Sequence, residues 1–179
     1  MNPKKAIILK VIILCILISF INYGGVNMFF KKTQISFSEL LEYVYLDKLN
    51  LTIYYASILN TSPFPFSVDH LISLNSTQKF VIDSDALKEH IDLLKQIGEQ
   101  IDNNVLIPTN EKSRMDARLY YVFKTKNNKS SFRVVALIGN NVMLVNDQEV
   151  KANNILIELI MPFLPESVAK ELQPILKRS

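Results

Sequence analysis

The sequence predicts an α+β domain with a mainly antiparallel sheet of four to six strands and helices packed on at least one face, preceded by an amino-terminal transmembrane or signal segment. Three observations support this class. Two segments with the features of strands are each followed by a segment with helical features. Three further segments with the features of strands then follow in succession, separated by turns rich in Asn and Gly, which is typical of a strand meander. The first 32 residues combine lysines with a long apolar run and contain no acidic residue.

Residues 1–32 are expected to form a signal anchor or signal peptide, and residues 33–179 a single extracytoplasmic domain. Three lysines precede the charge-free stretch 11–30, whose 20 residues would make about 30 Å of helix, enough to span the hydrocarbon core of a membrane. Only two lysines follow this stretch, so the positive-inside rule predicts a single-pass protein of the cell membrane with its carboxyl-terminal domain outside. Small residues are poorly placed for cleavage, but a cleaved segment would leave the domain secreted.

The charge of the predicted domain differs from that of the whole chain. Residues 1–32 hold five of the 20 basic residues, which leaves 15 basic and 17 acidic residues over 33–179, a net charge of about −2. Such a domain lacks the basic excess that phosphate neutralisation requires, so we expect no nucleic acid among its partners. The one cysteine, Cys15, lies in the apolar segment, so the domain has no disulfide and no thiol nucleophile.

The domain is expected to begin with a short helix and a half-buried strand. Ser36 and Glu39 form a capping box that would start a helix over 37–43. Apolar residues alternate with polar ones over 48–56, which predicts a strand with one buried face. The prolines of 62–66 cannot donate to a sheet, so this segment is expected to be a loop or an extended crossing.

A short helix over 67–74, a short strand over 78–82 and a longer helix over 85–97 are expected next. Asp83 can cap the longer helix, and Gly98 can end it in the left-handed conformation. Its apolar residues recur every three or four positions, which places them on one buried side. That side consists of Leu87, Ile91, Leu94 and Ile97.

The remainder of the domain is expected to contain a loop, the strand meander and two helices. The expected order is a long loop over 99–116, strands over 117–124, 132–138 and 142–145, and helices over 155–161 and from 165 to about 176. In the first of these strands Leu119, Tyr121 and Phe123 share one face. Apolar residues occupy both faces of the second strand, including Ile138, which indicates a central position in the sheet.

This order of elements, with the stretches Phe80-Val81-Ile82-Asp83-Ser84-Asp85 and Tyr121-Val122-Phe123-Lys124-Thr125-Lys126, resembles small membrane-anchored extracytoplasmic domains of unknown function from clostridia-like, low-GC Gram-positive bacteria. The resemblance covers about 45–160. Lysine outnumbers arginine 16 to 4 in the chain, a bias that fits a low-GC genome. The two stretches are not catalytic motifs, and the resemblance implies no activity.

The sequence contains few residues that point to catalysis. It has no nucleophile elbow, zinc-protease motif, phosphate-binding loop or dinucleotide fingerprint, and only four glycines, so no cofactor and no metal are expected. Asp69 and His70 are neighbours that would point about 100° apart on a helix, which does not suit an orienter and its base. His90 is expected to be a half-buried helix residue. Asp83 and Asp85 are better explained as helix-capping residues than as cation ligands.

Exposed aromatic side chains are the candidate ligand-binding residues. Tyr54 and Tyr120 fall on the polar phase of their strands, and Phe64 and Phe66 each follow a proline in the predicted loop. We therefore expect a non-enzymatic, membrane-tethered binding or accessory module, whose partner is a protein or a cell-envelope ligand. The alternatives are a cell-envelope hydrolase or transferase that uses carboxylates such as Asp69 and Asp83, or an immunity-like protein.

Overall fold

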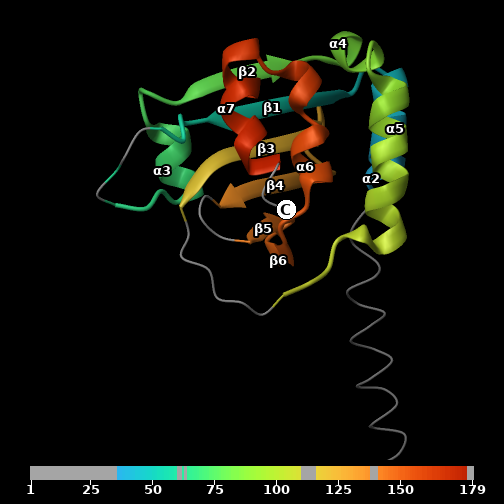
Figure 1. Ribbon diagram of the computed structural model, residues 1–179. Coiled ribbons are helices and arrows are strands. Elements are labelled where there is room, and N and C mark those ends of the chain that lie inside the picture. Colours follow the sequence, from blue (N-terminus) through green and yellow to red (C-terminus); the bar gives the residue numbers. More distant parts are fainter. Residues whose placement is uncertain (1–35, 60–61, 63, 110–115, 138–140, 177–179) are drawn as a thin grey trace, which may run out of the picture. The chain divides into compact units, whose positions relative to one another are not determined.

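Within the described residues, one antiparallel sheet contains six strands in the order β2-β1-β3-β4-β5-β6 (Figure 1). The computed structural model describes residues 36–59, 62, 64–109, 116–137 and 141–176. The strands are β1 (Leu49–Tyr55), β2 (Gln78–Ile82), β3 (Ala117–Thr125), β4 (Ser131–Leu137), β5 (Val142–Val145) and β6 (Gln148–Lys151). The α+β class, the meander and the interior position of β4 are confirmed.

Six strands lie within the predicted range of four to six, but β6 itself was not among the strands expected from the sequence. Asn146 and Asp147 join β5 to β6, and both have positive φ, 48° and 69°. Such a two-residue turn matches the twist of an antiparallel hairpin, and Asn and Asp tolerate it better than most residues. The turn brings Val150 of β6 into the core, next to Met143 of β5.

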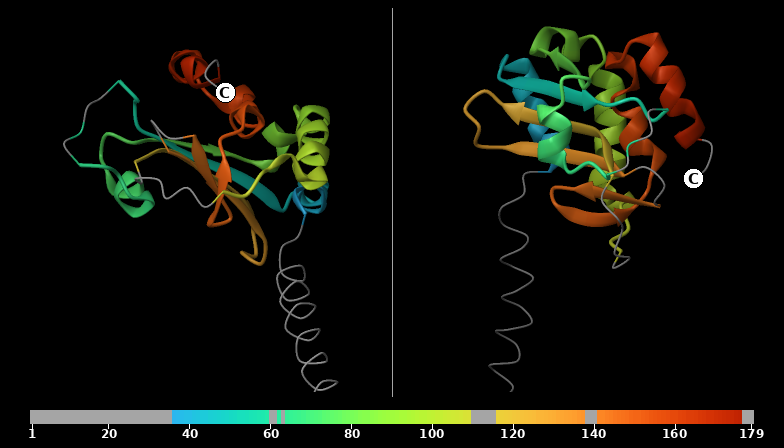
Figure 2. Two further views of the ribbon diagram at one scale, coloured as in Figure 1. Left: turned by 60° about the horizontal axis from the view of Figure 1, so that its bottom comes forward. Right: turned by 90° about the vertical axis from the view of Figure 1, so that its left-hand side faces the viewer.

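The helices are α2 (Phe37–Tyr45), α3 (Val68–Ser73), α4 (Ser84–Lys88), α5 (Ile91–Gln100), α6 (Asn154–Glu158) and α7 (Glu166–Leu176). Of these described helices, only α3 packs on the second face of the sheet, while the others contribute to the core on the first face (Figure 2). Burial alternates along β1 as predicted. The same strand phase turns Leu119, Tyr121 and Phe123 of β3 into the main core.

The helix expected over 85–97 is in fact two helices, and it does not end at Gly98. Asp83 caps α4 by accepting the N–H of Ala86 at 3.0 Å, as predicted. Glu89 and His90 then form a turn, after which α5 continues through Gly98 to Gln100. Leu87, Leu94 and Ile97 are buried as expected, and Ile91 packs against the same core although it is only partly buried.

Gly98 does not end the helix but lies where α5 packs closely against α2. A Cβ atom at this position would lie 3.1 Å from Cδ1 of Phe37 and 3.3 Å from Oγ of Ser38, both on α2. The chain then continues as a π-helical turn over Ile101–Val105, so the expected loop over 99–116 begins later than predicted. Asp102 in this turn accepts the N–H groups of Phe37 and Ser38, each at 2.9 Å, which places a carboxylate at the positive end of α2.

The predicted membrane segment lies outside the part of the chain that the structure describes. No helix among the described residues is long and apolar enough to cross a membrane. The predicted anchor over 11–30, Cys15 within it and Ile138 all lie outside the described residues. The anchor therefore stays a prediction.

Candidate functional site

Tyr54 and Tyr120 lie side by side on the second, more open face of the sheet. They are direct partners in the β1–β3 register. Their rings are stacked, with centroids 5.8 Å apart and planes at 18°. Both side chains are half-buried, so each keeps part of its surface in solvent. The structure thus brings together two residues that were predicted from the sequence as candidate ligand-binding residues on different strands.

These tyrosines belong to a row that crosses all six described strands. The cross-strand register aligns Lys79, Tyr54, Tyr120, Val135, Leu144 and Glu149. The Lys79 ammonium lies 5.5 Å from the Tyr54 ring centroid, and both tyrosines pack against the small apolar cluster on this face of the sheet. Burial is the main cause that raises the pKa of Tyr120, so its hydroxyl stays neutral at physiological pH.

A second row beside it extends the open face. Val81, Thr52, Val122 and Arg133 are aligned by the same register, and Val81 is 64% exposed. Arg133 forms an ion pair with Asp147 at 2.7 Å. Two buried polar atoms lack a hydrogen-bond partner among the described residues, Oδ1 of Asn50 and Nε of Arg133, and both residues fall on the strand phase that faces this side.

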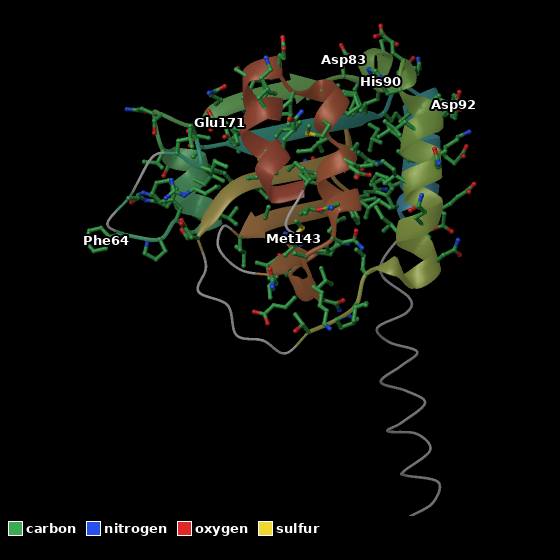
Figure 3. All side chains as sticks on the ribbon, viewed as in Figure 1. Phe64, Asp83, His90, Asp92, Met143 and Glu171 are labelled. Atoms are coloured by element: carbon green, nitrogen blue, oxygen red, sulfur yellow. The ribbon has the colours of Figure 1, made fainter. Side chains whose placement is uncertain are left out.

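Phe64 and Phe66, both candidate ligand-binding residues, lie in different environments. Phe64 is 76% exposed and projects away from the domain (Figure 3). Phe66 is half-buried; its ring lies 4.2 Å from the guanidinium carbon of Arg118 and 5.0 Å from the His70 ring. Its N–H also donates to Asp116. Phe66 therefore holds the loop against the sheet and α3, whereas Phe64 is available to a partner.

The buried Arg118 was not predicted from the sequence as a site residue. It forms an ion pair with Asp116 at 3.1 Å beneath Phe66, near the small core under α3. Alternation along β3 places Arg118 on the polar phase, and only the tertiary structure shows that α3 and the loop cover this end of the sheet. The pair of charges two residues apart at the start of a strand was the available signal.

The carboxylates proposed for the enzyme alternative are not brought together. Asp69 is on α3, which precedes β2, whereas Asp83 and Asp85 flank the start of α4, which follows it, so the strand separates them (Figure 1). Asp85 pairs with Lys88 at 3.0 Å. His90, which follows α4, is half-buried and its ring packs edge-on against Phe163. The described residues hold no cluster of His, Cys, Asp or Glu suited to a metal ion.

Glu171 of α7 is hydrogen-bonded to two hydroxyl groups near the end of β1. It accepts hydrogen bonds from the hydroxyl of Tyr55 at 2.5 Å and from that of Ser57 at 2.8 Å. Tyr55 is fully buried, and burial together with the Glu171 hydrogen bond raises its pKa. A phenol held protonated in this way does not act as a base at neutral pH. The two hydrogen bonds therefore fasten α7 to the end of β1.

Alkaline conditions are expected to weaken the domain through Tyr55. Because its pKa is raised above the ordinary 10.0, the folded protein keeps a proton that the unfolded chain releases. The stability that Tyr55 contributes is therefore present below about pH 10 and is lost as the pH rises further. Denaturant titrations of the wild-type protein and Tyr55→Phe should differ by about 1–3 kcal/mol at neutral pH and converge above about pH 10. A difference in unfolding free energy between the two proteins that stays the same above about pH 10 would contradict this role of Tyr55.

Comparisons with known proteins add no further assignment. No protein-family model, no curated protein and no solved structure matches the chain. No residue role can therefore be transferred from a relative. The resemblance to small membrane-anchored domains stays an expectation from the sequence.

Proposed function

We propose that this protein is a non-enzymatic binding or accessory module, tethered to the outer side of the cell membrane, whose ligand docks on the open face of the sheet. The observation that carries the proposal is the stacked pair of Tyr54 and Tyr120 beside Lys79. Tyrosine offers a large rigid apolar surface together with a hydroxyl, and it loses little conformational entropy on binding.

The asymmetry of the sheet supports this choice of surface. The first face is covered by five of the described helices, whereas α3 covers only one end of the second face. The exposed part of the second face combines the two tyrosines with Val81 and Lys79. Large apolar groups that stay partly exposed beside polar ones are typical of interaction surfaces.

The composition of this face indicates the ligand chemistry. The rings suit an apolar or sugar surface, and Lys79 suits an acidic group beside it. We therefore propose a protein or a cell-envelope component as the ligand. An immunity-like protein would be one form of this function. The hydrolase alternative has less support, because Asp69 lies at the other end of β2 from Asp83 and Asp85.

Photo-crosslinking tests the proposed surface. A photoreactive amino acid in place of Val81, in the full-length chain in intact cells, should give a discrete adduct. The same group in place of Glu158, which is exposed on α6 above the other face, should not give that adduct. The adduct should be lost when Tyr54→Ala and Tyr120→Ala are added.

The matched control for these two substitutions is Tyr45→Ala, because Tyr45 is 49% exposed on α2 and lies outside the row. It should leave the adduct intact. Circular dichroism of each variant separates a lost surface from a lost fold. Equal adducts from positions 81 and 158, or an adduct that persists in the folded Tyr54→Ala, Tyr120→Ala variant, would contradict the proposed site.

A further inference from the structure

Four lysines gather at one end of the sheet, which we call the lysine tip: Lys48, Lys124, Lys126 and Lys129. All four are exposed. Lys48 precedes β1, and its carbonyl accepts the N–H of Lys126 at 2.8 Å, so the start of β1 is fastened to the β3–β4 hairpin. The hairpin turn is braced by Thr125, whose N–H donates to Ser130 and whose hydroxyl donates to Asn127. The lysines therefore project from an ordered surface.

Two carboxylates near the lysine tip form ion pairs with basic residues outside it. Asp47 binds Lys88 at 2.5 Å, and this bond, with a smaller contribution from Lys126, lowers the pKa of Asp47. Asp147 forms an ion pair with Arg133, which lies near the start of β4. The four lysines of the tip thus form a cationic surface that is not neutralised by these neighbours, although the domain as a whole is slightly acidic.

The lysine tip lies beside the place where the chain enters the domain. α2 is the first described helix, and its first residue, Phe37, packs against Phe123 and Phe132 with ring centroids 5.1 and 4.6 Å apart. Phe123 and Phe132 are register partners on β3 and β4. The next pair toward the hairpin turn is Lys124 and Ser131. Both views of Figure 2 show the β3–β4 hairpin next to α2.

The chain outside the described residues limits how far this end can move from a membrane. Only five residues separate the charge-free stretch 11–30 from Ser36, and they include Lys31 and Lys32. Fully extended, such a connection spans at most about 20 Å. A membrane-embedded stretch 11–30 would therefore keep Ser36, the residue before α2, within about 20 Å of the bilayer.

We propose that the lysine tip binds the anionic lipid surface of the membrane that holds the anchor. This inference rests on the tethering part of the proposed function. Each lysine near an anionic bilayer adds on the order of 1 kcal/mol, which is about a fivefold gain in occupancy, and the tether adds a high effective concentration. Docking of the tip would hold the domain in one orientation and leave the Tyr54–Tyr120 surface, which lies nearer the other end of β1, free for its ligand.

Lysine acetylation in lipid nanodiscs tests the proposal on the full-length protein. Nanodiscs of phosphatidylcholine alone are compared with nanodiscs that also contain phosphatidylglycerol, and the modification of each lysine is measured by mass spectrometry. The four lysines of the tip should react several times more slowly with the anionic lipid, and high salt should remove the difference. Lys79, Lys151 and Lys170 are exposed elsewhere on the domain and should react equally in both.

Matched charge variants give the control. In the variant Lys124→Gln, Lys126→Gln, Lys129→Gln, the protection of Lys48 should be lost. In the variant Lys79→Gln, Lys151→Gln, Lys170→Gln, which removes the same charge, it should persist. Equal reactivity of the tip with both lipids, or equal protection of all seven lysines, would overturn the proposal. Protection by soluble polyglutamate as strong as that by anionic lipid would instead assign the tip to an acidic polymer and overturn it as well.

Vesicle flotation separates this inference from the proposed function. A full-length chain that floats with neutral vesicles but shows no protection by anionic lipid overturns the docking of the tip and leaves the anchor intact. A chain that floats with neither neutral nor anionic vesicles overturns the anchor, and the inference falls with it.

Discussion

Replacing Leu94 by alanine is expected to lower the free energy of unfolding by about 2–5 kcal/mol. Leu94 is fully buried on α5, where it belongs to the main core with Leu87 and Ile97. Truncation removes the transfer free energy of the lost atoms and leaves a cavity, because the packed residues of the main core restrict collapse of the site. Urea denaturation followed by circular dichroism measures the change, with the slope of the transition expected to stay constant.

The adjacent Leu93 provides the matched control for this prediction. It has the same side chain on the same helix but is 38% exposed. Leu93→Ala should cost much less than Leu94→Ala, since little apolar surface is withdrawn from a packed environment and alanine favours the helix. Equal losses for the two substitutions would show that α5 does not turn Leu94 into the core and Leu93 toward solvent.

Replacing Gly98 by leucine is expected to destabilise the domain by about 1–3 kcal/mol or more, by overpacking. A Cβ alone would already lie 3.1 Å from the Phe37 ring, and the remaining leucine atoms would have to displace α2. The gain in helix propensity, about 1 kcal/mol over glycine, does not offset this displacement. Thermal and urea unfolding of the purified variant measure the loss.

The neighbouring Glu99→Leu substitution isolates the steric effect. Glu99 is exposed on the same helix, so a leucine there meets no part of α2. This variant should be nearly as stable as the wild-type protein. Because Phe37 also contacts Phe123 and Phe132, Gly98→Leu should in addition loosen the base of the hairpin that carries the lysine tip. Faster amide hydrogen exchange in β3 and β4 would report it, and unchanged stability and exchange would contradict the close α2–α5 contact.

Local features of the sequence are sufficient to predict several elements of this protein. Alternation along β1 and β3 identifies which side chains enter the core, because successive residues of a strand point to opposite faces. The capping box of Ser36 and Glu39 and the cap at Asp83 are also correct, since each depends on residues within one helical turn. The polar phase of Tyr54 and Tyr120, and hence their place on the open face, follows from the same alternation.

Other features depend on segments that are distant in the sequence. Glycine is typical of helix ends, but Gly98 lies inside α5, where α2 approaches too closely for a larger side chain. The stacking of Tyr54 on Tyr120 depends on the β1–β3 register, and the contact of Phe66 with Arg118 depends on how the loop crosses the sheet. Local propensity does not encode a register or an approach between remote segments.

The sequence by itself therefore determined the α+β class, the phase of the main strands and the first helix caps, because these rest on interactions within a few residues. Only the tertiary structure decided which strands are neighbours, which face of the sheet stays open, and how four lysines from two separate segments meet at one end. The reason is that pairing register and packing distance arise from the simultaneous burial of the whole core, to which each local segment contributes only a part.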